Sequence, residues 1–161
     1  MKNIMLFIIG LIIMLVEVFF TNFISSFISV NFLLIYIIFI SLYIDKNNAL
    51  ILCALLGLIS DLMSGGIVGV STILFLATSY FISIIEKSIF KDKRGIVCLL
   101  VAIVSVFYSI ISAVFSAIFF VPTPIIIALI KCIVAIPAAN TLVAFFGYTI
   151  FEERLKKLRE E

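Results

Sequence analysis

The chain has 161 residues, of which 65% are hydrophobic and 12% are charged. A soluble domain is nearer half apolar and a quarter charged, so this composition excludes most soluble functions and indicates a membrane protein. The net charge of only +2 does not point to nucleic-acid binding.

The first two apolar runs predict a pair of transmembrane helices. The first helix covers residues 4–20, and Glu17 within it favours a retained helix over a cleaved secretory signal. The second helix ends near Ile44, but its start is ambiguous. Counted from Asn31 it is about 21 Å long, short of a hydrocarbon core of roughly 30 Å. We therefore expect it to begin near Phe27 or to lie where the rest of the protein covers its end.

The remaining apolar runs predict four more helices, at residues 49–62, 67–85, 96–120 and 125–150. A tight turn, a glycine turn, a charged loop and a proline turn separate the helices, at residues 45–48, 64–66, 86–95 and 121–124. Pro137 predicts a kink in the last helix, because proline lacks the backbone N–H. The predicted fold class is all-α: a polytopic domain of six transmembrane helices at residues 1–150, followed by a short charged tail at residues 151–161.

The basic residues follow a topological pattern. Ten of the eleven Lys and Arg residues lie at the chain ends or after the second and fourth apolar runs: Lys2, Lys46, Lys87, Lys91, Lys93, Arg94, Arg154, Lys156, Lys157 and Arg159. The other gaps between apolar runs contain none. Because basic residues concentrate on the cytoplasmic side, the pattern predicts six crossings with both termini in the cytoplasm.

The tyrosines support the same orientation. Tyr43, Tyr80 and Tyr148 fall near the predicted cytoplasmic ends of their helices. Tyrosine is enriched at both membrane interfaces, so these three residues predict an interfacial aromatic belt.

Three ionisable side chains, Glu17, Asp61 and Lys131, lie inside predicted helices. Charged groups in a membrane are costly and indicate a functional site by default. In the predicted topology all three fall in the outer half of the membrane. Three interpretations remain open: a structural polar cluster in which Lys131 neutralises the carboxylates, a docking or ligand pocket open to the outside, and separate snorkelling to the interface.

Small residues recur at every fourth position of the fifth predicted helix, at Ser105, Ser109, Ala113 and Ala117. Such a smooth stripe lets two helices approach closely in lipid. It favours either packing against another helix of this chain or contact with the single transmembrane helix of a partner.

The sequence contains no recognisable catalytic or cofactor motif. It has no His, and Cys53, Cys98 and Cys132 lie far apart in apolar runs, which is typical of buried thiols. There is no GxSxG element, no glycine-rich phosphate loop and no acidic pair with metal-like spacing. The sequence therefore predicts no enzyme activity, no cofactor and no metal site.

Residues 56–70, LGLISDLMSGGIVGV, resemble the signature of the MreD family of rod shape-determining proteins. That signature has a G-L-x-x-D element, a short turn of small residues, and a glycine that opens the next helix. Gly57, Asp61 and Gly69 match it, and the chain length, the six apolar runs and the basic tail are also similar. Asn31 stands where members often carry a proline.

The resemblance implies a non-enzymatic scaffold of the cell-elongation machinery in the bacterial cytoplasmic membrane. Members of this family associate with the bitopic protein MreC. With it they link MreB filaments to the RodA glycosyltransferase and its class B penicillin-binding partner. The family fold is similar to the six-helix S-components of energy-coupling-factor transporters. Gly57 and Gly69 would be packing or turn positions, and Asp61 would cap the outer end of the helix 3–4 hairpin.

The scaffold interpretation expects the helices to hold the MreC transmembrane helix in a groove. The alternative is a true S-component that binds a small vitamin, with Glu17, Asp61 and Lys131 lining its pocket. The absence of Trp and His weighs against that alternative, because such pockets depend on converging aromatic and polar groups.

Overall fold

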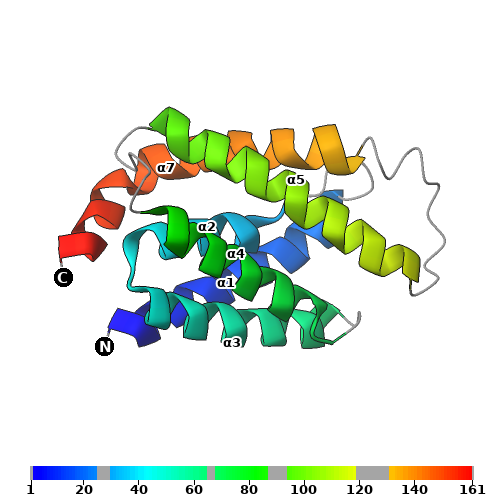
Figure 1. Ribbon diagram of the computed structural model, residues 1–161, viewed down its shortest axis with the longest axis horizontal. Coiled ribbons are helices and arrows are strands. Elements are labelled where there is room, and N and C mark those ends of the chain that lie inside the picture. The colour runs from blue at the N-terminus through cyan, green and yellow to red at the C-terminus, as the bar shows by residue number, and fades with distance from the viewer. Residues whose placement is uncertain (1, 25–29, 65–67, 87–93, 119–130, 161) are drawn as a thin grey trace.

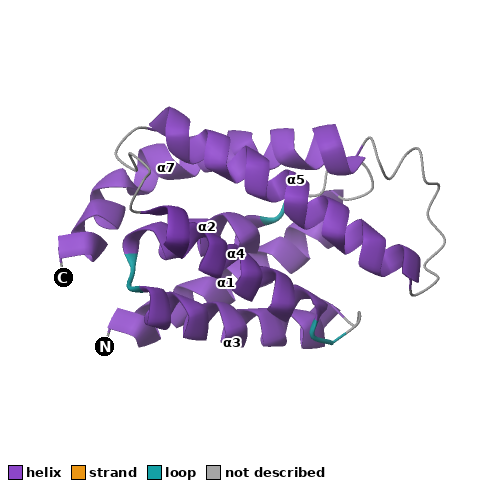
Figure 2. Cartoon of the chain, in the orientation of Figure 1, coloured by secondary structure: helices purple, strands orange, loops and turns teal. Residues whose placement is uncertain are grey.

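The computed structural model describes residues 2–24, 30–64, 68–86, 94–118 and 131–160. These residues form six helices and no strand, which confirms the all-α prediction. The last helix begins with a π-helical turn, η2, that continues directly into α7. The bounds are α1 (Lys2–Ile24), α2 (Phe32–Tyr43), α3 (Lys46–Ser64), α4 (Val70–Ile85), α5 (Arg94–Ile118), η2 (Lys131–Ala135) and α7 (Ile136–Glu160). Only short loop segments separate the helices in the described part of the chain (Figure 2).

The helices lie in three layers of two. In Figure 1, α5 and α7 form the upper layer, α2 and α4 the middle layer, and α1 and α3 the lower layer, and the two helices within each layer are in contact. Successive helices run in opposite directions, so both chain termini lie at the same end of the molecule (Figure 1). Successive connections therefore alternate between the two ends of the bundle.

Four helices are long and apolar enough to cross a membrane, namely α1, α3, α5 and α7. The helices α2 and α4 are apolar but shorter, with 12 and 16 residues. At 1.5 Å per residue, α2 is only about 18 Å long. The chain is a multi-pass membrane protein in which a short helix lies among longer ones.

The core of the bundle is built around α2. Ten of its 12 residues are buried, and it contacts every other α-helix. A helix that is hydrophobic on all sides lies in a protein core or in lipid, and the burial of α2 places it in the core of the bundle. The four long spans instead bury one side and expose large apolar side chains on the other, as lipid-facing helices do.

Several helix boundaries differ from the sequence-based expectation. The helix α1 continues to Ile24, and α3 begins at Lys46 rather than at residue 49, so most of the predicted turn is helical. The helix α4 begins at Val70, because Gly69 before it has a φ of 102°, which an L side chain adopts only with strain. Of the two starts considered for α2, residue 27 lies outside the described residues. The structure shows the helix beginning at Phe32.

The predicted belt of tyrosines is wrong for two of its three members. Tyr43 and Tyr148 are buried, and their hydroxyls lie 3.2 Å apart. The Tyr148 ring also packs edge-on against Phe39. Tyr80 is half exposed, and the ammonium of Lys46 lies 4.3 Å from the centre of its ring, which is a cation–π contact. The contact between the hydroxyls of Tyr43 and Tyr148 therefore joins α2 to α7.

Candidate functional site

The N-terminus of α2 lies inside the bundle, where its backbone N–H groups need partners from the protein itself. Glu17 of α1 accepts a hydrogen bond from the Leu33 N–H at 2.7 Å and interacts with that of Phe32. Asn31 caps the helix by accepting from the Leu34 N–H at 2.7 Å. Unpaired backbone groups are costly in a bilayer, so these contacts are what permits a helix this short.

Asn140 of α7 completes this arrangement from the opposite layer. Its Oδ1 accepts from the Asn31 N–H at 2.8 Å, and its Nδ2 donates to the Ser105 hydroxyl of α5 at 3.0 Å. Asn140 and Ser105 are both fully buried. A single amide therefore connects α2, α5 and α7.

Asp61, near the end of α3, caps the N-terminus of α4. One carboxylate oxygen, Oδ2, accepts from the Gly69 N–H at 2.8 Å, the Thr72 N–H at 3.1 Å and the Thr72 hydroxyl at 2.8 Å. The other, Oδ1, accepts from the Ser71 N–H at 3.0 Å. A negative charge at a helix N-terminus is also favoured by the helix dipole. Asp61 thus holds the α3–α4 hairpin closed.

Tyr108 of α5 lies between the two capped helix ends. Its side chain interacts with those of Ser71 and Asn31. Its ring stacks on Phe75 of α4, with the centroids 5.5 Å apart. We call the set that joins all six helices the polar layer; its members are Glu17, Asn31, Asp61, Ser71, Thr72, Ser105, Tyr108 and Asn140.

The buried polar side chains of the polar layer are engaged in hydrogen bonds within the described part of the protein. Every buried side-chain nitrogen or oxygen there has a hydrogen-bond partner. No group of three His, Cys, Asp or Glu side chains that could hold a metal occurs in the described part of the chain. The three cysteines are buried and unbridged. As arranged, the described groups of the polar layer hold helices together.

The three charged residues singled out from the sequence occupy different positions. Glu17 and Asp61 each meet the N-terminus of a different helix, α2 and α4. Tyr108 interacts with one residue at each of these helix ends, Asn31 and Ser71. Lys131 begins η2, and its side chain lies outside the described residues. Sequence reasoning treated Asn140 as an interhelical hydrogen-bonder without identifying its partners and missed the role of Tyr108, because neither residue carries a motif. The sequence signal for these two residues was that each is a polar side chain in the middle of an apolar run.

The stripe of small residues on α5 faces the last helix over its described part. Ser105 and Ser109 are buried; Ser105 bonds to Asn140, and the Ser109 carbonyl accepts from the Cys132 thiol at 3.5 Å. Ala113 is partly buried, and the side chain of Ala117 lies outside the described residues.

Gly57 lies where α3 and α4 are in close contact. A Cβ atom added at Gly57 would sit 2.6 Å from the Thr72 Cα and 3.1 Å from the Thr72 backbone nitrogen. Asp61 is one turn further along α3 and binds that same residue of α4. The close approach and the cap therefore depend on one another.

We expect Glu17→Leu to lower the free energy of unfolding by about 3 kcal/mol, because it leaves two buried N–H groups without an acceptor. Glu17→Gln keeps one acceptor oxygen and should cost about 1 kcal/mol. Val16→Leu, at an exposed neighbouring position, is the matched control with little expected effect. The three variants are compared by their unfolding midpoints, measured in the same detergent. Equal losses for Glu17→Leu and Val16→Leu would contradict the capping role.

The family profile described as rod shape-determining protein MreD matches residues 2–149 of the chain. That range includes every residue of the polar layer and all six described helices up to the last turns of α7. No curated protein and no solved structure matches the chain.

Proposed function

Because the chain belongs to the MreD family of rod shape-determining membrane proteins, we propose that it is a non-enzymatic scaffold of the cell-elongation machinery. In this role it binds the transmembrane helix of MreC. Together with MreC it couples MreB filaments to the peptidoglycan synthases, RodA and a class B penicillin-binding protein. The family membership implies the part in rod-shape determination; the partners are the content of the proposal.

The observation that carries the proposal is the division of polar and apolar groups. The side chains of the polar layer make their contacts inside the bundle, while the outer faces of the helices are apolar. A membrane protein of this kind recognises other proteins through helix surfaces, by close van der Waals packing in lipid. This suits a scaffold better than an enzyme or a carrier.

The proposed topology has six crossings with both termini in the cytoplasm. Two observations support it. The termini share one end of the bundle, and Lys46 and Arg94 begin α3 and α5 at that same end (Figure 1). Basic residues favour the cytoplasmic side, so this end faces inward and the polar layer lies toward the outside.

The groove for the MreC helix lies on an exposed helix face. Ser105 and Ser109 are buried against the last helix, so bulky residues there would disturb the bundle before they touched a partner. The exposed apolar faces of α1, α3, α4, α5 and α7 remain as candidate docking surfaces. The proposal requires that one of them is specific for MreC.

A tryptophan scan of the exposed faces tests this requirement. The positions are one per helix, on α1, α3, α4, α5 and α7: Ile12, Leu55, Ile73, Phe107 and Phe146. Added bulk is tolerated against lipid but overpacks a helix interface, so one face should lose MreC recovery by about tenfold. Membrane accumulation and unfolding midpoint serve as controls for each variant. Unchanged recovery at all five positions would contradict docking by a helix face.

Affinity purification from gently solubilised native membranes tests the proposal as a whole. Recovery of MreC with RodA or a class B penicillin-binding protein supports the scaffold. Recovery of a transport module with paired ATPases would overturn it in favour of the vitamin-binding S-component.

A further inference from the structure

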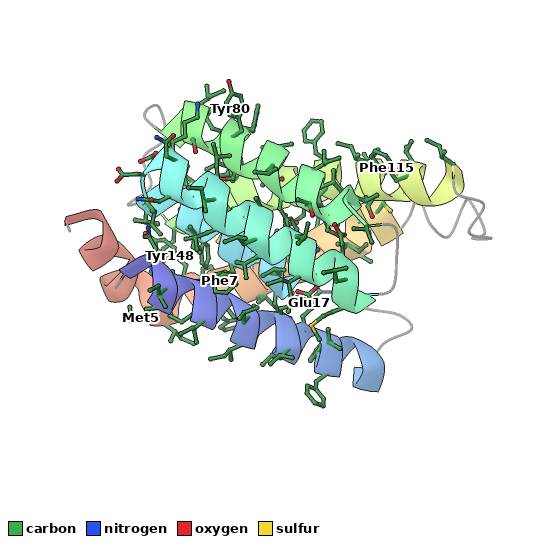
Figure 3. The ribbon with its side chains drawn as sticks, turned by 90° about the horizontal axis from the view of Figure 1, so that it is seen from below. Met5, Phe7, Glu17, Tyr80, Phe115 and Tyr148 are labelled. Carbon is green, nitrogen blue, oxygen red and sulfur yellow. The ribbon has the colours of Figure 1, made fainter. Side chains whose placement is uncertain are left out.

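The far ends of α5 and the last helix form a unit apart from the core. We call residues 110–118 of α5 together with η2 the distal pair. None of the described side chains in residues 110–118 is buried, and no described member of the distal pair belongs to the apolar core around α2. The end of α5 that carries Phe115 extends beyond the other helices in Figure 3.

The contacts of η2 explain this separation. It packs against α5 and α7, and its buried residue Cys132 donates to the Ser109 carbonyl. By contrast, Ala144 and Tyr148, which follow in α7, are part of the core around α2. Among the described residues, the last helix therefore contributes to the core around α2 only beyond its first turns.

The backbone of the last helix is irregular at this boundary. Residues Lys131–Ala135 are π-helical, and Pro137 follows. Pro137 has no N–H to donate to the carbonyl of Ile133, so the regular ladder of helix hydrogen bonds is interrupted there. Bends in helices arise at prolines and π-turns. Asn140, one turn further on, then ties the helix to α2 and α5.

We propose that the distal pair moves as one unit relative to the rest of the bundle, with the last helix pivoting at Pro137 and Asn140 as the fixed point on the body side. On the core side of the hinge, the last helix is held to both ends of α2: Asn140 bonds at its start and Tyr148 contacts Tyr43 at its end. On the other side of the hinge, η2 contacts α5 through the Cys132 thiol and the Ser109 carbonyl, and none of the described side chains of residues 110–118 is buried. The hinge does not depend on the scaffold role or on MreC.

Pulsed electron–electron distance measurements on the full chain in lipid nanodiscs test the hinge. Spin labels at Leu62 of α3 and Val114 report the distal pair, and labels at Ile51 of α3 and Leu99 of α5 are the control across the same two helices; all four positions are exposed. The background carries Cys53→Ala, Cys98→Ala and Cys132→Ser, the last of which keeps a donor for Ser109.

We expect the Leu62–Val114 distance distribution to be at least about twice as wide as the control distribution. Pro137→Ala restores the missing N–H and should narrow it to the control width. A distal distribution as narrow as the control would overturn the proposal, and so would two equally broad distributions or a width that Pro137→Ala leaves unchanged. Should Pro137→Ala fail to accumulate, the comparison of the two label pairs without it still decides the question.

Discussion

We expect Asp61→Asn to lower the free energy of unfolding by about 3 kcal/mol. The carboxylate accepts at least four hydrogen bonds, three of them from backbone N–H groups at the start of α4. The asparagine amide offers one acceptor oxygen and turns its NH2 group toward donors. At least one buried N–H is left unpaired, and the favourable charge at the helix N-terminus is lost.

Asp45→Asn is the matched control, because it makes the same chemical change at an exposed acidic residue next to the start of α3. We expect a change below about 0.5 kcal/mol there. The midpoints of thermal unfolding in one detergent compare the two variants. If Asp61→Asn were as stable as Asp45→Asn, the cap would not hold the hairpin. Retained stability with loss of a bound small molecule would instead favour a pocket at Asp61.

Gly57→Ala is the second large effect, a destabilisation of about 3 kcal/mol. Its new methyl group would lie 2.6 Å from the Thr72 Cα, a backbone atom that cannot rotate away. The two helices must separate, and that movement draws Thr72 away from the Asp61 carboxylate. The loss therefore combines overpacking with a weakened cap.

Gly95→Ala provides the control for Gly57→Ala. Gly95 lies in the first turn of α5, and a Cβ atom there meets nothing within 4 Å. Alanine is a better helix former than glycine, so we expect a gain of up to about 1 kcal/mol. The expected result is that the same substitution lowers the unfolding midpoint at Gly57 and raises it at Gly95. A neutral Gly57→Ala would show that α3 and α4 do not need this close approach.

These two experiments also connect the family signature to physical causes. Gly57, Asp61 and Gly69 are one structural device: the glycine lets the helices meet, the carboxylate caps the second helix, and the left-handed Gly69 turns the chain into it. The double variant of Gly57 and Asp61 should therefore be less destabilised than the sum of the single variants, since both act on Thr72.

The sequence predicted part of the polar layer. Glu17 and Asp61 were found because a carboxylate in an apolar run is expensive in lipid. Asn31 was noted as a possible start of the second helix and as a departure from the family signature, whereas its side chain and backbone both bond at the N-terminus of α2. Tyr108 was not singled out, because an aromatic residue in an apolar helix does not show which polar groups it will meet.

By itself, the sequence determines that this protein is helical and resides in a membrane. Long apolar runs must satisfy their backbone groups within each segment, and only helices do so without distant partners. The tertiary structure decides how a helix as short as α2 survives, because its first N–H groups depend on Glu17 of one layer and Asn140 of another. Asn31 and Asn140 lie 109 positions apart in the chain, and no local pattern specifies a contact across that separation.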